Sequence, residues 1–257
     1  MTLNDPVIEL RDLGLCYRLA KQRPGSFKEY MIHMVRGSLI YEELWALDDI
    51  QVTVQRGELV GVVGRNGAGK STMSKVIAGV LEPSRGTCVV RGTTSAILEL
   101  GTGFDPELTG LENLYLNALL RGHRRKEIDT KLDEIVAFSG IGDFIHSPVR
   151  NYSTGMMARL GFSIATAWIP DVLILDEVLA VGDTRFVARC HERLHEFRAA
   201  GTTIILVSHS PTEIIEHCTR CLWLDEGKLC ADGDPKDILA AYVGRDEEPK
   251  PESRILS

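Results

Sequence analysis

Three short runs of mostly apolar residues stand out along the chain: Leu59–Val63, Val172–Leu175 and Thr203–Val207. Strands of a parallel sheet are covered on both faces, so they carry apolar side chains at successive positions rather than at alternate ones. We therefore expect these runs to form the parallel core sheet of an α/β protein.

Other patterns predict additional strands and a helical region. Further strands are expected at Val7–Leu13, Ala46–Val54, Cys88–Gly92 and Thr94–Leu100, and a hairpin at Leu222–Leu229. From about residue 109 to 163 the apolar spacing becomes helical, with interruptions at 140–143 and around Pro148.

A separate helical pattern precedes the core. Pro24-Gly25 breaks the chain, and the segment from Ser26 to Glu29 fits a capping box. Apolar residues then recur at helical spacing: Phe27, Tyr30, Met31, Met34 and Val35. This predicts a short amphipathic helix over 26–36. Its apolar face could pack on its own domain or on a partner, and on general grounds its own domain is favoured. The charged, proline-bearing tail at 244–257 is expected to be disordered.

Composition narrows the class of protein. Apolar residues make up 44% and charged residues 25% of the 257 positions, as in ordinary globular proteins. The net charge of −7 argues against a nucleic-acid surface, which needs a basic stripe. The chain has no apolar run long enough to span a membrane and no signal peptide, so we expect a protein that is not exported.

The six cysteines are scattered, which favours reduced core residues over a redox or metal site. Cys218 and Cys221 form a lone C-x-x-C without a second pair. Cys190, His191 and His195 could be drawn as a metal cluster, but a solvated helical face is the favoured interpretation of their charged stretch.

The strongest chemical signal is a phosphate-binding loop that follows the first apolar run. Its G-x-x-x-x-G-K-[ST] pattern is made by Gly64, Arg65, Asn66, Gly67, Ala68, Gly69, Lys70, Ser71 and Thr72. The glycines allow backbone N–H groups to approach phosphates closely, Lys70 reaches the β- and γ-phosphates, and Ser71 can ligate Mg²⁺. A helical pattern follows, so the helix N-terminus points at the phosphates. The sequence therefore predicts a nucleoside triphosphate site.

Two carboxylates and a histidine follow the other apolar runs. Asp176 ends the second run and is placed to hold Mg²⁺, while Glu177 could accept a proton from the attacking water. His209 follows the third run and could donate to the γ-phosphate.

A second possible phosphate surface lies at Tyr152–Leu160. Ser153 and Gly155 begin a helical stretch there, and a hydroxyl, a glycine amide and a helix N-terminus together can bind phosphate. Alone, such a string is more often a helix cap. Because the loop at 64–72 already supplies one phosphate site, a functional second surface would serve the nucleotide of another copy.

At this point the chain resembles an ATP-binding cassette ATPase over residues 7 to 243. Five segments match that family in order: Walker A at 64–72, the signature motif at 153–156, Walker B at 172–176 with Glu177, the D-loop aspartate Asp183, and the switch histidine His209. The resemblance implies a mostly parallel core sheet with an antiparallel β subdomain and a helical subdomain at about 105–165. It also implies a homodimer binding ATP and Mg²⁺, in which Ser153 and Gly155 of one subunit face Lys70, Ser71, Asp176 and Glu177 of the other.

Within that family the chain is similar to ATPase subunits that export lipid-linked polysaccharides of the O-antigen or teichoic-acid type. The segments that carry this are Leu98–Phe104, Glu107–Gly110, Tyr152–Met156 and Asp176–Asp183. The resemblance implies a separate multi-span permease, a polyprenyl-linked glycan as substrate, and a peripheral position at the cytoplasmic face of the cell membrane. It also reverses the preference for the 26–36 helix, which would then contact the permease or its lipid.

Some positions depart from the family pattern or stay open. Glu99 stands where a glutamine is usual, and Thr154 and Met156 replace the commoner signature residues. Tyr17 is the candidate for stacking on adenine, with Trp45 as its rival. The alternatives to transport are a cassette ATPase acting on DNA or ribosomes, which usually shows a coiled-coil insertion or two cassettes, and a small-molecule kinase, which would leave Ser153–Met156 without a purpose.

Overall fold

The computed structural model describes residues 6–20, 41–98, 103–177 and 183–246. Its centre is a six-stranded sheet in the order β5-β6-β7-β3-β8-β9. The strands are β3 (Leu59–Val63), β5 (Thr94–Ile97), β6 (Val172–Asp176), β7 (Thr203–Val207), β8 (Arg220–Asp225) and β9 (Lys228–Gly233). All neighbours are parallel except β8 and β9. The expected parallel core and terminal hairpin are therefore confirmed.

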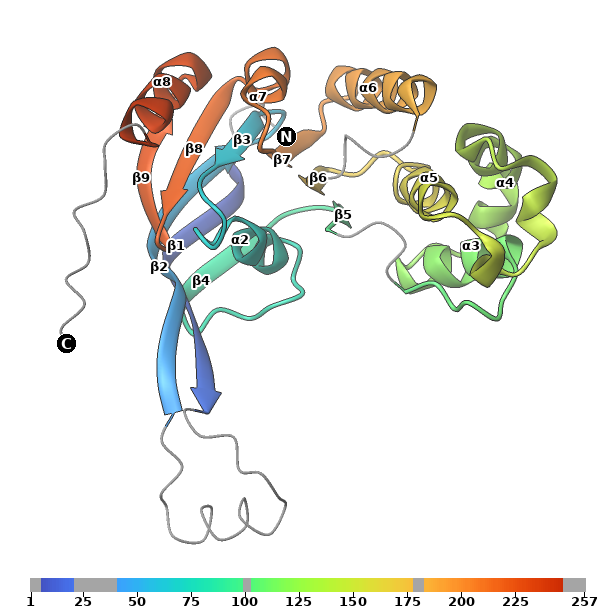
Figure 1. The fold of residues 1–257 in the computed structure, drawn as a ribbon, viewed down its shortest axis with the longest axis horizontal. Coiled ribbons are helices and arrows are strands. Elements are labelled where there is room, and N and C mark those ends of the chain that lie inside the picture. The colour runs from blue at the N-terminus through green and yellow to red at the C-terminus, as the bar shows by residue number, and fades with distance from the viewer. Residues whose placement is uncertain (1–5, 21–40, 99–102, 178–182, 247–257) are drawn as a thin grey trace, which may run out of the picture.

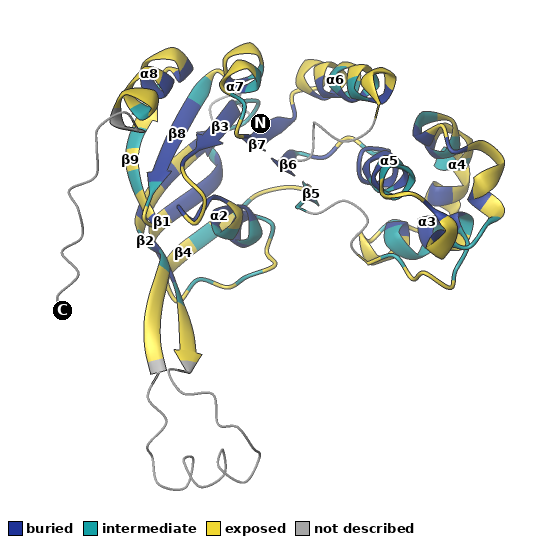
Figure 2. Cartoon of the chain, in the orientation of Figure 1, coloured by how far each residue is buried: buried dark blue, intermediate teal, exposed yellow. Residues whose placement is uncertain are grey.

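The central strands β3, β6 and β7 are buried along their whole length because both faces of the sheet are covered (Figure 2). Val60, Ile174 and Ile205 point to one face and pack with α2 (Lys70–Ile77) and the strands of a second sheet. Leu173 and Leu206 point to the other face. That face is covered by α5 (Thr154–Ala165), α6 (Thr184–Ala199), α7 (Pro211–His217) and α8 (Pro235–Asp246).

The second sheet is antiparallel, in the order β2-β1-β4, with β1 at Pro6–Ala20, β2 at Tyr41–Gln55 and β4 at Arg85–Val90. The hairpin of β1 and β2 projects away from the core (Figure 1). Both strands are longer than the sequence predicts. Their outer parts are largely exposed (Figure 2), so the side chains there do not alternate between a core face and a solvent face and give no strand pattern.

The helical region forms a lobe beyond β5 with a hydrophobic core of its own (Figure 1). It contains α3 (Gly110–Leu120), α4 (Arg125–Ser139), α5 and two short 3₁₀ helices, Gly142–His146 and Val149–Asn151. The 3₁₀ segments account for the predicted interruptions. A capping box between Thr109 and Glu112 starts α3.

Some predictions fall outside the described residues: the amphipathic helix at 26–36, Glu99, and the tail beyond residue 246. Helix α8 continues to Asp246, past the boundary expected after residue 243. Among the described helices, none combines the length and hydrophobicity that a membrane crossing requires.

Candidate functional site

The phosphate loop connects β3 to α2, and its outer glycines are required by close backbone contacts. Gly64 has a φ of 150°, and a Cβ there would lie 2.2 Å from the carbonyl oxygen of Leu224. Gly69 has a φ of 103°, and its Cβ would lie 2.5 Å from the carbonyl oxygen of Ala46. Any larger side chain would therefore move the loop. Gly67 instead faces open space, with no heavy atom within 4 Å of where its Cβ would lie.

Lys70 is buried under the loop that it serves. Its Nζ donates to the carbonyl oxygens of Gly64, at 2.7 Å, and Arg65, at 3.1 Å. Burial lowers the pKa of Lys70, and the nearby carboxylates of Glu177 and Asp176 act in the opposite direction. The ammonium group therefore stabilises the shape of the loop through these two carbonyls.

An open hollow lies over this loop. It is lined by Ala46, Asn66, Gly67, Gly69, Lys70, Ser71, Thr72 and Glu177. The structure thus brings most of the predicted loop residues together with the carboxylate that follows β6. Gly64, Arg65 and Ala68 do not line the hollow, and they shape the loop through the backbone; Ala68 N–H, for example, donates to the Arg65 carbonyl at 3.1 Å.

Asp176 and Ser71 are the two residues that the sequence predicts to hold Mg²⁺. Asp176 ends β6 and is only 6% exposed, and its Oδ1 is buried without a hydrogen-bond partner. Burial raises the pKa of Asp176, while a hydrogen bond with the Ser71 side chain acts to lower it. A buried carboxylate oxygen without a partner is costly unless a ligand completes it, and Mg²⁺ prefers such oxygens. The residues present therefore fit the metal.

Glu177 and His209 meet at the carboxyl edge of the sheet. His209 Nε2 lies 2.7 Å from Glu177 Oε1, and both side chains are about half exposed. Glu177 has a φ of 57°, and its N–H donates to the carbonyl of Val207 at 3.0 Å. A left-handed conformation is uncommon outside glycine and is found where the surroundings enforce it. It directs the carboxylate toward the hollow and His209.

Ser153, Gly155 and Asp183 lie apart from this hollow. Ser153 is the exposed N-cap of α5, and its Oγ accepts the N–H of Met156 at 3.2 Å. Asp183 caps α6 by accepting the N–H of Phe186 at 2.9 Å, a bond that lowers its pKa. None of the three lines the hollow, and Figure 1 shows α5 in the helical lobe, away from α2. Their place in a nucleotide site of another subunit stays a prediction.

The two aromatic candidates for adenine stacking point to opposite faces of the β1–β2 hairpin. Trp45 stands opposite Cys16, and Tyr17 opposite Leu44. The guanidinium of Arg85 lies 5.4 Å from the centre of the Trp45 ring, so Trp45 already packs on its own sheet. Tyr17 is 37% exposed but does not line the hollow, and its stacking role stays a prediction.

Sequence reasoning missed two kinds of residue near this site. Ala46, which lines the hollow, carries no sequence signal. Ser208 and Glu213 flank His209 and are joined to each other by a hydrogen bond of 2.6 Å. The S-x-x-E pattern from Ser210 to Glu213 could have pointed to Glu213, but no sequence signal marks Ser208.

The cysteines and histidines outside the site form no metal centre in the described ranges. Burial raises the pKa of Cys190, Cys218 and Cys221 to about 12, so these thiols stay protonated. Cys190 faces the core, which differs from the expected solvated face.

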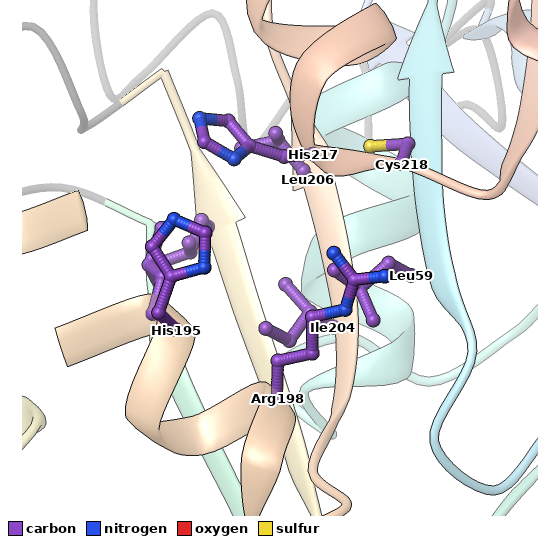
Figure 3. Close-up of a pocket in the computed structure, with 9 residues that line it drawn as sticks. Leu59, His195, Arg198, Ile204, Leu206, His217 and Cys218 are labelled. Atoms are coloured by element: carbon purple, nitrogen blue, oxygen red, sulfur yellow. The ribbon is translucent and has the colours of Figure 1, made fainter. Parts of the chain in front are cut away.

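The neighbouring histidines pack against one another instead. The rings of His191, on α6, and His217, on α7, are stacked with their centres 4.9 Å apart. Figure 3 shows His195 and His217 on either side of a small apolar cavity there, which is separate from the phosphate loop.

Comparison with known proteins identifies the family. The family model described as "ABC transporter" matches residues 47–180, more than half of the chain. The chain belongs to the ABC transporter family. The resemblance drawn from the sequence is confirmed, and so is the ATPase fold.

Relatives and solved structures agree with this ABC ATPase assignment. The O-antigen export system ATP-binding protein RfbB of Klebsiella pneumoniae is 42% identical over 240 residues, 93% of this chain and 98% of RfbB. The teichoic acids export ATP-binding protein TagH of Staphylococcus haemolyticus is 38% identical, covering 88% of this chain and 84% of TagH. A solved "ATP binding subunit of ABC transporter" superposes with a TM-score of 0.72 at 26% identity, covering 92% of this chain and 93% of that structure.

Proposed function

We propose that this ABC ATPase is the ATP-hydrolysing subunit of an exporter that moves a polyprenyl-linked polysaccharide across the cytoplasmic membrane. The observation that carries its catalytic part is the Glu177–His209 contact beside a complete phosphate loop. The export part rests on similarity to the RfbB and TagH proteins over most of their length. A separate multi-span permease, bound at the cytoplasmic face, would be the partner of a homodimer, with the helix expected at 26–36 near it.

The catalytic residues act by position and charge. Loop amides and Lys70 hold the β- and γ-phosphates, while Glu177 accepts a proton from the attacking water and His209 orients the γ-phosphate end. Ser71 and Asp176 would hold Mg²⁺, which when bound neutralises phosphate charge. Tyr17 would stack on the adenine.

The second half of the site comes from a partner subunit in this proposal. Ser153 is exposed at the start of α5, where its hydroxyl and the free amides of the first turn can face a phosphate. Gly155 and Asp183 would lie at the same interface. Because Ser153, Gly155 and Asp183 lie apart from the phosphate loop of their own subunit, each nucleotide would be bound between two subunits.

Replacing Glu177 tests the catalytic assignment. Glu177→Gln is expected to lower ATP hydrolysis at least about 100-fold, because the amide cannot accept the proton. It should also trap an ATP-bound dimer, seen by size-exclusion chromatography with ATP and Mg²⁺. Glu192→Gln, an exposed change on α6, is the matched control. Normal turnover by Glu177→Gln would refute the role of Glu177.

Depletion in the native cell tests the export assignment. Loss of the ATPase should cause a lipid-linked glycan to accumulate inside the cell. In a separate experiment on undepleted cells, the ATPase should co-purify with its permease. Co-purification with ribosomes or DNA, without glycan accumulation, would favour the non-transport alternative.

A further inference from the structure

His209 sits inside a hydrogen-bonded ring that follows β7. The hydroxyl of Ser208 donates to Glu213 Oε2 at 2.6 Å and accepts the N–H of Ser210 at 3.0 Å. Ser210 Oγ accepts the N–H of Glu213 at 3.4 Å and caps α7. His209 is the residue between the two serines, so the ring constrains the backbone on both of its sides.

The ring differs from an ordinary capping box in one respect. In a capping box the glutamate at the third helical position accepts the N–H of the cap residue directly. Here the Ser208 hydroxyl stands between them, since it accepts a hydrogen bond from the Ser210 N–H and donates one to Glu213. Helix capping alone needs only Ser210 and Glu213. The cap therefore does not account for the hydrogen bonds of Ser208.

The surroundings of Ser208 make this arrangement rigid. Ser208 is only 7% exposed, so its hydroxyl would lose hydrogen bonding without Glu213 and Ser210. The preceding residue, Val207, accepts the N–H of Glu177 at 3.0 Å. The ring is thus joined through one peptide unit to the turn that carries the proposed catalytic carboxylate.

We propose that Ser208 and Glu213 are positioning residues that hold the imidazole of His209 against Glu177. The proposal rests on the proposed function, which gives Glu177 and His209 their roles. Neither Ser208 nor Glu213 lines the hollow, so both act through the placement of His209. Misplacing a catalytic group by a fraction of an ångström lowers the rate of the chemical step more than it lowers substrate binding.

Steady-state ATPase assays of purified variants give the first test. Ser208→Ala and Glu213→Ala should each lower kcat about tenfold, with the KM for ATP changed less than about twofold. Glu213→Gln keeps an oxygen acceptor for Ser208 and should retain most of the activity. Thr212→Ala, at an exposed position on the same helix, is the control and should be silent. Equal loss of activity in Glu213→Gln and Glu213→Ala would overturn the proposal.

A double-mutant cycle separates positioning from general damage. In a His209→Ala background, Ser208→Ala or Glu213→Ala should reduce kcat no further, because the group they position is gone. Multiplied losses would mean that the ring affects kcat independently of His209 and would overturn the proposal. If Ser208→Ala does not fold, as judged by its thermal unfolding midpoint, Glu213→Ala carries the cycle. Unchanged hydrolysis in His209→Ala alone would instead refute the role that the proposed function gives to His209.

Discussion

At the scale of single residues, the phosphate loop has no space for a side chain at Gly64. Its φ of 150° and the 2.2 Å distance from a Cβ to the Leu224 carbonyl combine backbone strain with overlap. Gly64→Ala is expected to lower the free energy of unfolding by at least about 3 kcal/mol, measured by urea denaturation. Gly67→Ala is the matched control, since it meets only the left-handed penalty of about 1–2 kcal/mol and faces open space. Equal costs would contradict the overlap at Gly64.

The proximity of the proposed catalytic residues could be predicted from the sequence because parallel strands end at one edge. Asp176 ends β6 and His209 follows the neighbouring parallel strand β7, so both lie at the same edge of the sheet. The stacking aromatic could not be chosen in this way. The register of β1 and β2 shifts between Leu15 and Cys16, and such an irregularity changes which face a side chain occupies.

At the scale of elements, predictability followed burial. The strands β6 and β7 are buried on both faces and were predicted almost to the residue, whereas the outer parts of β1 and β2 lie beyond the core and were missed. Those outer segments pair through backbone hydrogen bonds, which leave no pattern in side-chain polarity. A sequence records what a strand packs against more clearly than where it ends.

Helices α6 and α7 meet through histidines, and this contact predicts an acid sensitivity. Burial lowers the pKa of His217, and the positive charges of His191 and His195 act in the same direction, against Glu216 and Glu213. The folded state therefore favours neutral His217. The contribution of neutral His217 to the free energy of unfolding is complete above the pKa of about 6.5 that a histidine has in the unfolded chain. As the pH falls below about 6.5 this contribution is lost, because the unfolded state binds a proton that the folded state does not.

His217→Gln should flatten this acid dependence. The unfolding free energy of the wild type should fall as the pH drops below about 6.5, while that of the variant falls less. Urea denaturation at several pH values measures it, with His146→Gln, an exposed position in the helical lobe, as control. An identical slope in wild type and His217→Gln would contradict the assignment.

At the scale of the whole molecule, the proposed site requires complementary halves from two chains. Lys70→Ala should remove the phosphate loop's cation, and Ser153→Arg should block the surface offered to the partner, so each variant alone should be inactive. A mixture forms some dimers that pair an intact loop with an intact Ser153 surface. Random exchange would restore about a quarter of wild-type ATPase activity. Continued inactivity of the mixture would contradict a site shared between chains.

One contact within the subunit gives this arrangement a further meaning. Arg159, on the helix that Ser153 begins, lies 3.4 Å from the carboxylate of Asp183, which follows Glu177 in the chain. In the proposed dimer, Ser153 would touch one nucleotide and Glu177 the other. The ion pair would then connect, within one chain, the residues that contact the two nucleotides of the dimer. Such a contact would make the position of the Ser153 surface depend on the position of the segment that carries Glu177.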